Sequence, residues 1–398
     1  MEYSFEDYKF NYLTSLIFIF VFSFLIVYLN KINLSTELLW NKERFNLTNI
    51  KNEIEIYQNY QNISISSFNL QYFGESIKPK VSIIVPIFNQ EKNLKSFYMS
   101  IYNQSLKDIE IIFINDASTD NSRQIIEEFM QKDKRIVLMR NDSTERTYFL
   151  KTKGIFKSRG EYVLFVSPDD LLLNDILKKA YETAKINDLD IVQYYLIIGN
   201  HKNNRLWKNI KCKSGIIHYP KTKDYFYNCR CPNIFDKLIR RKTFINSMKY
   251  FLREFNDDKF DYSDDDLTFY GLSKVAESYG FLEEPGYFYN TKDPWTITNK
   301  EYRNKDIDKI FSKQFVIMRY LLNQADSNRQ DKLWGYKLFY NRVYKFRNKL
   351  IFLKKHFEFI NKVLDMYLNC IFFNKEEKEK LMKFKNELNR IQLKKMIL

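Results

Sequence analysis

The sequence predicts an α/β fold in which a mostly parallel sheet carries helices on both faces. Short apolar runs alternate with amphipathic stretches from about residue 78 to residue 300, and this alternation is typical of βαβ units. Hydrophobic residues make up 45% of the 398 residues, which is enough for a large core. Only 9 glycines and 7 prolines occur, which favours long regular elements over loops.

Five strands are expected in the first half of this region. Residues 81–85 (VSIIV) form a β-branched run closed by Pro86, which is typical of a buried parallel strand. The other four runs have the same character and lie at residues 109–114, 135–139, 161–166 and 190–196. Helices with one apolar face are expected between the strands, at residues 92–103, after residue 121, at residues 149–158 and after residue 174.

Composition divides the chain into five parts. Residues 1–11 are a short tail, and residues 12–29 carry no charge over a length that can cross a hydrocarbon core. Because the tail is acidic and the apolar run is long, an uncleaved single-pass membrane anchor is predicted rather than a signal peptide. Residues 30–77 are polar and predict a stem. Residues 78–300 predict the α/β domain, and residues 301–398 a basic region that is helical in pattern.

Several other classes of protein are not supported by the sequence. The four cysteines form no CxxC pair and no histidine stands near them at zinc spacing, so a structural zinc site is not expected. A disulfide and free thiols both fit the cysteine pattern. No GxGxxG, GxxxxGK[ST] or GxSxG motif occurs. The net charge of +15 is attributed to solvated lysines, and no nucleic-acid partner is expected.

Polar side chains follow three of the predicted strands at the point where each strand ends. They lie in residues 86–89, at Asp116 and in residues 167–170. The carboxyl ends of parallel strands meet at one edge of a sheet, and ligands bind there. A nucleotide base needs a stacking face and an edge acceptor, and a diphosphate needs a cation held by oxygen ligands. The pair Asp169-Asp170 alone would be an ordinary acidic turn; its strand context suggests a metal-diphosphate site.

Three segments closely resemble the nucleotide-binding half of family 2 glycosyltransferases, which have the GT-A fold. They read VSIIVPIFNQEKNL, DIEIIFINDASTDNS and KGIFKSRGEYVLFVSPDDLL. The resemblance continues in NIFDKLIRRKTF and YSDDDLTFYGLSKVAESYGFLEEPGYFYNTKDPWTIT, and covers about residues 80–299. It implies a metal-dependent, inverting hexosyl- or hexosaminyltransferase. Such an enzyme moves a sugar from a nucleotide-sugar, most often UDP-linked, to a hydroxyl of a glycan, protein or lipid.

The resemblance also implies roles for residues of this chain in binding the nucleotide. Phe88 would stack on or border the base, with Pro86 and Asn89 beside it. Asp116 would accept a hydrogen bond from the edge of the base, and Asp169 would lie near the ribose.

The metal and the catalytic base are expected among further acidic residues. By the resemblance, Asp170 would bind Mn²⁺ or Mg²⁺ together with the diphosphate. Asp264 and Asp265 fall where the family places the carboxylate that deprotonates the acceptor, and Asp265 is the preferred candidate. Consecutive carboxylates raise one another's pKa, which suits a base. The alternative is an acidic loop in which Asp266 caps a helix.

Three departures from the family pattern bear on these roles. Ser167 stands where the family usually has an acidic ligand, and Phe88 stands where tyrosine is common. Lys151-Thr152 replaces the usual Arg-Asn pair. Lys151 is a candidate phosphate contact, with Arg146 as another candidate and a solvated helix lysine as the structural alternative.

Two further functions are compatible with the sequence. Ser167 fits a non-catalytic descendant that binds a sugar nucleotide or a glycan. An excess of basic residues after the anchor fits a lipid-phosphate glycosyltransferase that faces the cytosol. Anchored sugar-transferring enzymes commonly work in the Golgi lumen, and five sequons occur, so a Golgi or ER protein with a lumenal catalytic domain is the expectation.

Overall fold

The structure is a computed structural model, and only part of the chain is described in it. The described residues are 47–59, 65, 73–145, 147–173, 175–199, 204–207, 215–218, 222, 233–250, 264–291, 357–358, 360–361, 364–365, 368 and 374–396. The expected anchor at residues 12–29 lies outside them. Within the described ranges, no helix is both long and apolar enough to span a membrane.

The chain forms two compact units, residues 1–53 and 54–398. Helix α2 (Leu47–Asn59) contains the boundary between them. Near the other end, helix α14 (Lys375–Met396) buries Leu381, Phe384 and Leu388, which share one helix face. This helix agrees with the helical pattern predicted for the C-terminal region.

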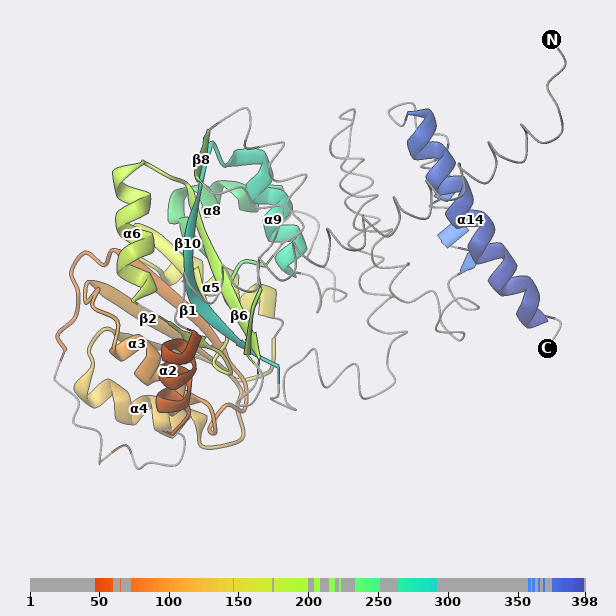
Figure 1. The fold of residues 1–398 in the computed structure, drawn as a ribbon. Helices are drawn as coiled ribbons and strands as arrows, with labels where there is room; N and C mark the ends of the chain where they lie inside the picture. The colour runs from red at the N-terminus through yellow and green to blue at the C-terminus, as the bar shows by residue number, and fades with distance from the viewer. Residues whose placement is uncertain are drawn as a thin grey trace, which may run out of the picture. The chain divides into compact units, whose positions relative to one another are not determined.

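Ten strands form one sheet in the described part of the second unit (Figure 1). The strands are β1 (Val81–Ile87), β2 (Ile109–Asp116), β3 (Ile136–Asn141), β4 (Tyr162–Phe165), β5 (Leu171–Leu172), β6 (Ile191–Gly199), β7 (Asn204–Trp207), β8 (Gly215–His218), β9 (Lys237–Arg240) and β10 (Ser278–Asn290). Their order is β3-β2-β1-β4-β9-β6-β10-β5, with β7 beside β6 and β8 beside β10. All five strands predicted from the sequence are present.

The directions of the strands determine where the site lies. Strands β1, β2, β3 and β4 are parallel, and β10 is parallel to β6. Strand β9 is antiparallel to both β4 and β6, so β6 runs in the same direction as β4. Six strands, β1, β2, β3, β4, β6 and β10, therefore end at one edge of the sheet. We call this edge the C-terminal edge.

The expectation of a mostly parallel sheet was wrong for the second half of the domain. Five of the nine strand pairs among the described residues are antiparallel. Strands β5 and β9 have only two and four residues, too few to produce a periodic pattern. In β10, the pairing with β6 shifts register between Leu282 and Tyr287, around Pro285, which breaks the strand pattern in the sequence.

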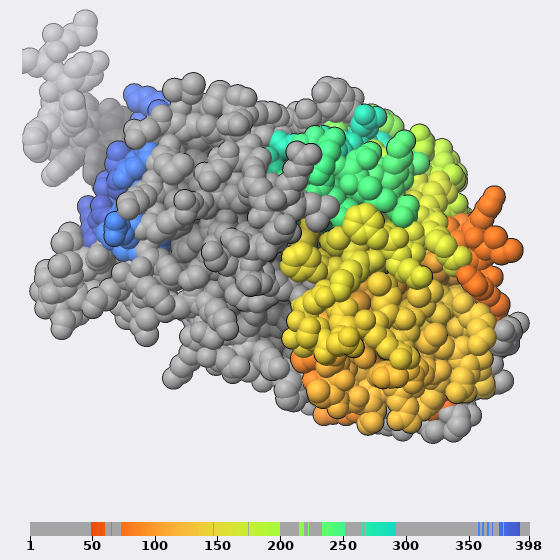
Figure 2. Space-filling view, turned by 180° about the vertical axis from the view of Figure 1, so that it is seen from behind, coloured from red at the N-terminus to blue at the C-terminus, as the bar shows by residue number. Residues whose placement is uncertain are grey.

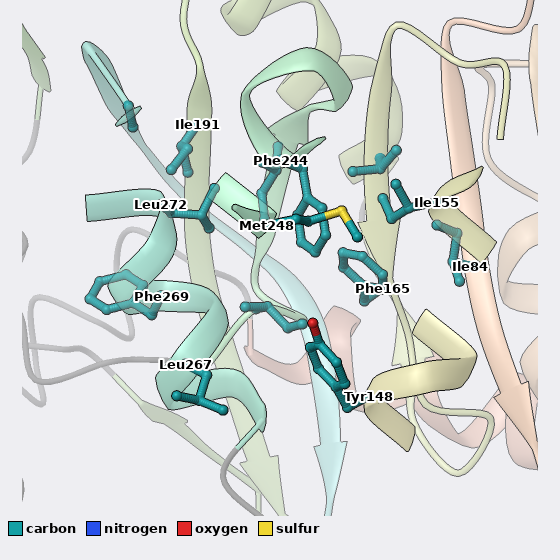
Figure 3. Close-up of a cluster of buried hydrophobic side chains, with 14 of the residues drawn as sticks. Ile84, Tyr148, Ile155, Phe165, Ile191, Phe244, Met248, Leu267, Phe269 and Leu272 are labelled. Atoms are coloured by element: carbon teal, nitrogen blue, oxygen red, sulfur yellow. The ribbon is translucent and has the colours of Figure 1, made fainter. Parts of the chain in front are cut away.

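Helices cover both faces of the sheet, as predicted. They are α3 (Leu94–Tyr102), α4 (Ser122–Lys132), α5 (Thr147–Lys157), α6 (Ile176–Ile186), α8 (Arg241–Met248) and α9 (Asp264–Val275). On one face, α5, α8 and α9 pack on the sheet through a shared apolar cluster that includes Ile84, Phe165, Phe244 and Phe269 (Figure 3). On the other face, Phe97 of α3 packs edge-on against Phe113 of β2.

Helices α5 and α8 lie next to each other on their face of the sheet. Arg241, the first residue of α8, donates from Nη2 to the Ile155 carbonyl oxygen of α5 at 3.4 Å, and from Nε to Oγ of Ser158, the residue after α5, at 2.9 Å. Figure 2 shows that the green segment that contains α8 adjoins the yellow segment that contains α5 at the surface. This packing fixes α5 and the helices of the second half on one common support.

At the opposite edge of the sheet, a buried carboxylate holds the starts of three strands together. Glu110 accepts hydrogen bonds from the Ser82 hydroxyl at 2.6 Å and from the Arg159 and Gly160 amides at 2.5 and 3.2 Å. The Gly160 amide also donates to Ser82 Oγ at 2.8 Å. A glycine is needed here, because a Cβ at position 160 would lie 2.6 Å from the Ser82 backbone nitrogen.

Substitution Gly160→Ala should therefore lower the free energy of unfolding by about 1–3 kcal/mol, because backbone has to move to admit the methyl group. Thermal unfolding followed by circular dichroism measures this effect. Gly74→Ala is the matched control, since a Cβ there meets no heavy atom within 4 Å. Equal stability of the two variants would contradict the requirement for glycine at position 160.

Candidate active site

Two loops at the C-terminal edge are cross-linked by hydrogen bonds. One follows β1 and the other follows β2. The Asn89 amide donates to Ser118 Oγ at 3.0 Å, and the Thr119 amide donates to Asn89 Oδ1 at 2.8 Å. The Glu91 amide donates to Asp120 Oδ2 at 3.0 Å. Asn89 has a left-handed backbone with φ of 52°, a conformation that asparagine tolerates. The cross-links make this corner of the edge a fixed platform.

An exposed ring and a buried carboxylate lie at this corner, and they belong to two of the candidate residues from the sequence, Phe88 and Asp116. Phe88, the residue after β1, is 46% exposed, which is unusual for phenylalanine. Asp116, the last residue of β2, is 4% exposed. Its Oδ1 atom accepts from Asn141 Nδ2 at 3.0 Å and from the Glu145 amide at 2.8 Å, while no hydrogen bond from a described residue reaches Oδ2. One acceptor atom of Asp116 is therefore available to a ligand.

Asn141 and Lys153 hold the Asp116 carboxylate in place. Lys153 Nζ donates to Asn141 Oδ1 at 3.1 Å and to Glu145 Oε1 at 2.5 Å. Asn141 lies at the end of β3, and Lys153 lies in α5. Neither residue was predicted from the sequence to belong to the site. The order of the strands could have pointed to Asn141, because β3 lies beside β2 and Asn141 at the end of β3 is adjacent to Asp116.

The turn after β4 brings Asp169 and Asp170 to the same edge. The Ser167 hydroxyl donates to Asp169 Oδ1 within this turn, and both residues are at least partly exposed. Asp170 is only 2% exposed. It accepts from the Tyr287 hydroxyl at 2.7 Å and from the Asn290 amide at 2.8 Å. Burial, with a further contribution from Asp170, raises the pKa of Tyr287, so its hydroxyl keeps the proton that it donates.

Lys151 and Asp265 meet although 114 residues separate them. Lys151 Nζ lies 3.0 Å from Asp265 Oδ1, and the two side chains are 14% and 24% exposed. Lys151 comes from the second turn of α5 and Asp265 from the first turn of α9. The ammonium also lies 5.9 Å from the ring centre of Phe165, the last residue of β4. The predicted phosphate contact and the predicted base are thus partners beside the turn that carries Asp169.

The remaining predicted residues are placed less completely. Pro86 lies within β1 and is half-buried beside the loop that carries Phe88 and Asn89. Asp264 opens α9 next to Asp265, and its side chain is outside the described part of the chain. Arg146, the other candidate phosphate contact, is also outside it.

Comparison with known proteins places this arrangement in a family. Residues 82–248 match the family model described as glycosyl transferase family 2. These residues form a family 2 glycosyltransferase domain. The match contains the strands β1 to β4 with the platform and the acidic turn, and it ends with α8.

Individual relatives agree with this family. The domain is similar to the glycosyltransferase GlyG of Streptococcus pneumoniae, with 33% identity over 123 residues, 31% of this chain and 39% of the relative. It is 28% identical over 247 residues to an uncharacterized glycosyltransferase, EpsJ, of Bacillus subtilis, covering 60% of this chain and 68% of EpsJ. The chain thus spans about two fifths of GlyG's length.

The fold of the chain is also similar to that of S. aureus TarS. A crystal structure of TarS in complex with UDP-GlcNAc superposes with a TM-score of 0.60 and 18% identity, covering 79% of this chain and 88% of that one. The α/β architecture is therefore the one found in a glycosyltransferase, in agreement with the predicted GT-A class.

The oxygen atoms of the acidic turn suit a divalent cation of the type predicted from the sequence. Among the described residues, no three Asp, Glu, His or Cys side chains surround a common point. Mg²⁺ commonly uses only one or two protein carboxylates and takes further ligands from substrate phosphates. The Asp169 carboxylate and the Ser167 hydroxyl fit such a shared site. The Asp170 carboxylate, predicted as the ligand, lies beneath them and already accepts from Tyr287 and Asn290.

Substitution Tyr287→Phe should lower the free energy of unfolding of the second unit, residues 54–398, by about 1.5–3 kcal/mol. It removes a hydrogen bond to a carboxylate that water cannot reach. Tyr181→Phe is the matched control, because the Tyr181 hydroxyl donates to Glu161 at 3.1 Å in a partly exposed position. Chemical denaturation measures the free energy of unfolding of both variants. An equal loss in Tyr181→Phe and Tyr287→Phe would contradict a special contribution of the buried hydrogen bond to Asp170.

Proposed function

We propose that the domain transfers a sugar from a nucleotide-sugar, with UDP as the nucleotide, to a hydroxyl of an acceptor with inversion at the anomeric carbon. One observation carries the proposal: groups suited to a base, to a diphosphate and to proton abstraction converge at the C-terminal edge of a family 2 domain. These groups are Phe88, Asp116, Lys151, Asp169 and Asp265.

Recognition of the nucleotide is assigned to the corner of the β1 and β2 loops. The exposed face of Phe88 would stack on the uracil ring, since aromatic pairs gain from such contact. Asp116 Oδ2 would accept from the uracil N–H, while Oδ1 is held by Asn141 and the Glu145 amide. Carboxylate acceptors select a ring N–H donor, and this favours uracil over a base that presents an acceptor at that position.

The diphosphate is assigned to the space beside the acidic turn. A bound Mn²⁺ or Mg²⁺ would stabilise the negative charge on the leaving diphosphate. Asp169 and Ser167 would hold the cation, and Asp170 would keep their turn against β10 through Tyr287. Lys151 would supply a second positive charge, since its ammonium lies beside the end of β4.

Asp265 is assigned as the base of a single displacement. Its carboxylate would take the proton of the acceptor hydroxyl, and the acceptor oxygen would form a bond to the anomeric carbon. The bond from that carbon to the diphosphate oxygen breaks on the opposite face, and its electron pair leaves with UDP. Attack from the face opposite the leaving group inverts the anomeric configuration.

Ser167 supports a second candidate function, a domain that binds a sugar nucleotide without turning it over. It places a hydroxyl where the family pattern has a carboxylate, and a hydroxyl is a weaker ligand for a divalent cation. Release of UDP separates the two candidates. The proposal also includes a membrane anchor at residues 12–29, which lie outside the described ranges, a lumenal location, and an acceptor on a glycan, protein or lipid.

The proposed function predicts that the chain releases UDP from at least one UDP-sugar in the presence of Mn²⁺. Asp116→Asn should weaken UDP binding, and Asp169→Asn should lower the rate. Asp265→Asn should lower transfer about 10²–10⁴-fold, the usual contribution of a general base. A panel of UDP-sugars assayed for UDP release, and then for transfer to added acceptors, measures these effects.

Asp108→Asn is the matched control for these variants. Asp108 precedes β2 at the opposite edge of the sheet and forms an exposed ion pair with Lys80. Its loss should leave UDP release within about twofold of the unaltered chain. UDP binding without release from any donor would favour the non-catalytic candidate. Full transfer by both Asp169→Asn and Asp265→Asn would refute the site.

A further inference from the structure

According to the proposed function, two anions, the Asp265 carboxylate and the donor diphosphate, compete for the single ammonium group of Lys151. It is paired with Asp265 at 3.0 Å, and the donor diphosphate is assigned to the space beside the same ammonium. A lysine ammonium is a compact charge on a flexible four-carbon stem, so it can move between neighbouring anions. A diphosphate presents several phosphate oxygens, and those that the cation does not contact can accept charge-assisted hydrogen bonds from the ammonium in competition with the single carboxylate of Asp265.

The pairing with Lys151 is unfavourable for a catalytic base. The ion pair occupies Oδ1 of Asp265, which is one of the two oxygens that can take the acceptor proton. The positive charge also stabilises the ionised carboxylate and reduces its tendency to accept a proton. Both side chains are largely buried, so water screens the pair only weakly. The base is therefore restrained as long as Lys151 stays beside it.

Neither of the two lysines that follow Lys151 in α5 fits its role. Lys153, one half-turn further along α5, is bound to Asn141 and Glu145 and supports Asp116. Lys157 lies at the exposed end of the same helix. Lys151 alone among these three contacts Asp265 and lies over Phe165, which leads into the acidic turn.

We propose that the donor diphosphate draws Lys151 away from Asp265, so that the base is released only after the donor has bound. The inference rests on the proposed function and adds an order of events to it. Before the donor binds, the Lys151–Asp265 pair keeps the base occupied and an acceptor hydroxyl is not deprotonated. After binding, Lys151 contacts phosphate oxygens and Asp265 faces the acceptor. The sugar is thereby transferred from a complex in which the leaving group is already neutralised.

The inference predicts changes in the affinity for UDP, which can be measured without sugar transfer. If UDP must compete with Asp265 for Lys151, then Asp265→Asn should tighten UDP binding about three- to tenfold. Lys151→Met should weaken UDP binding about tenfold, because a charged contact to phosphate is lost. Uridine has no phosphate, so its affinity should stay within about twofold in every variant. Isothermal titration calorimetry measures the affinities of the unaltered full chain and of each variant for UDP and for uridine.

The double variant separates competition from simple repulsion. Removal of a negative charge near an anion can tighten binding by itself, and the Lys151→Met background measures that part. The inference requires that Asp265→Asn tighten UDP binding much less in this background than in the unaltered chain. Lys157→Met is the matched control, since it removes a charge from the same helix without touching Asp265. Its UDP affinity should equal that of the unaltered chain.

Asp265→Asn could tighten UDP binding equally in the unaltered chain and in the Lys151→Met background, or in neither. Either outcome would overturn the inference and leave the proposed function intact. No binding of UDP by the unaltered chain would contradict the proposed function itself. Unchanged uridine affinity in Asp265→Asn reports an intact fold, and Asp265→Ala gives a second test if the asparagine variant does not bind uridine.

Discussion

Asp170 joins the two halves of the sheet at the edge where the candidate active site lies. Its turn follows β4, and its two oxygens accept hydrogen bonds from Tyr287 and from the amide of Asn290 in β10. Among the described strands, the four-residue strand β9 lies between β4 and β6 and pairs with both. A buried carboxylate is costly unless its hydrogen bonds are made, so the position of the turn is tightly specified. Asp169 and Ser167 depend on that position.

The functional groups on either side of this junction come from different parts of the chain. The β1 and β2 loops supply Phe88 and Asp116 on a platform fixed by backbone amides and short polar side chains. Helices α5 and α9 supply Lys151 and Asp265 and rest on the apolar cluster that includes Phe165 and Phe269 (Figure 3). Rigid support of this kind is what positioning of a donor and a base requires.

The first half of the fold and the nucleotide corner could be predicted from the sequence. Residues 81–85 and 109–114 are continuous β-branched runs, and the residues that follow them must lie at the same edge of a parallel sheet. Local pattern therefore pointed to the segments that contain Phe88 and Asp116, and the resemblance to a family supplied their roles. The resemblance to a family added Asp265, which has no local signal beyond three consecutive acids.

The second half could not be predicted, because its contacts are long-range. Strand β9 is too short for a periodic signal, and β10 contains Pro285 at a shift of register. Tyr287 reaches Asp170 across 117 residues, and Lys151 reaches Asp265 across 114. Such pairs follow from helix and strand packing, which no spacing in the sequence encodes. The burial of Asp170 below Asp169 also became visible only in three dimensions.

A crystal structure of the full chain with UDP and Mn²⁺ tests the central claim most directly, namely that a nucleotide diphosphate binds at the C-terminal edge. We expect the uracil ring to stack on Phe88 and to donate a hydrogen bond from its N–H group to Asp116, and we expect the diphosphate to lie between Asp169 and Lys151. We also expect a longer distance from Lys151 to Asp265 than the 3.0 Å of the unliganded site. UDP bound elsewhere, without contact to Phe88 or Asp116, would contradict the claim.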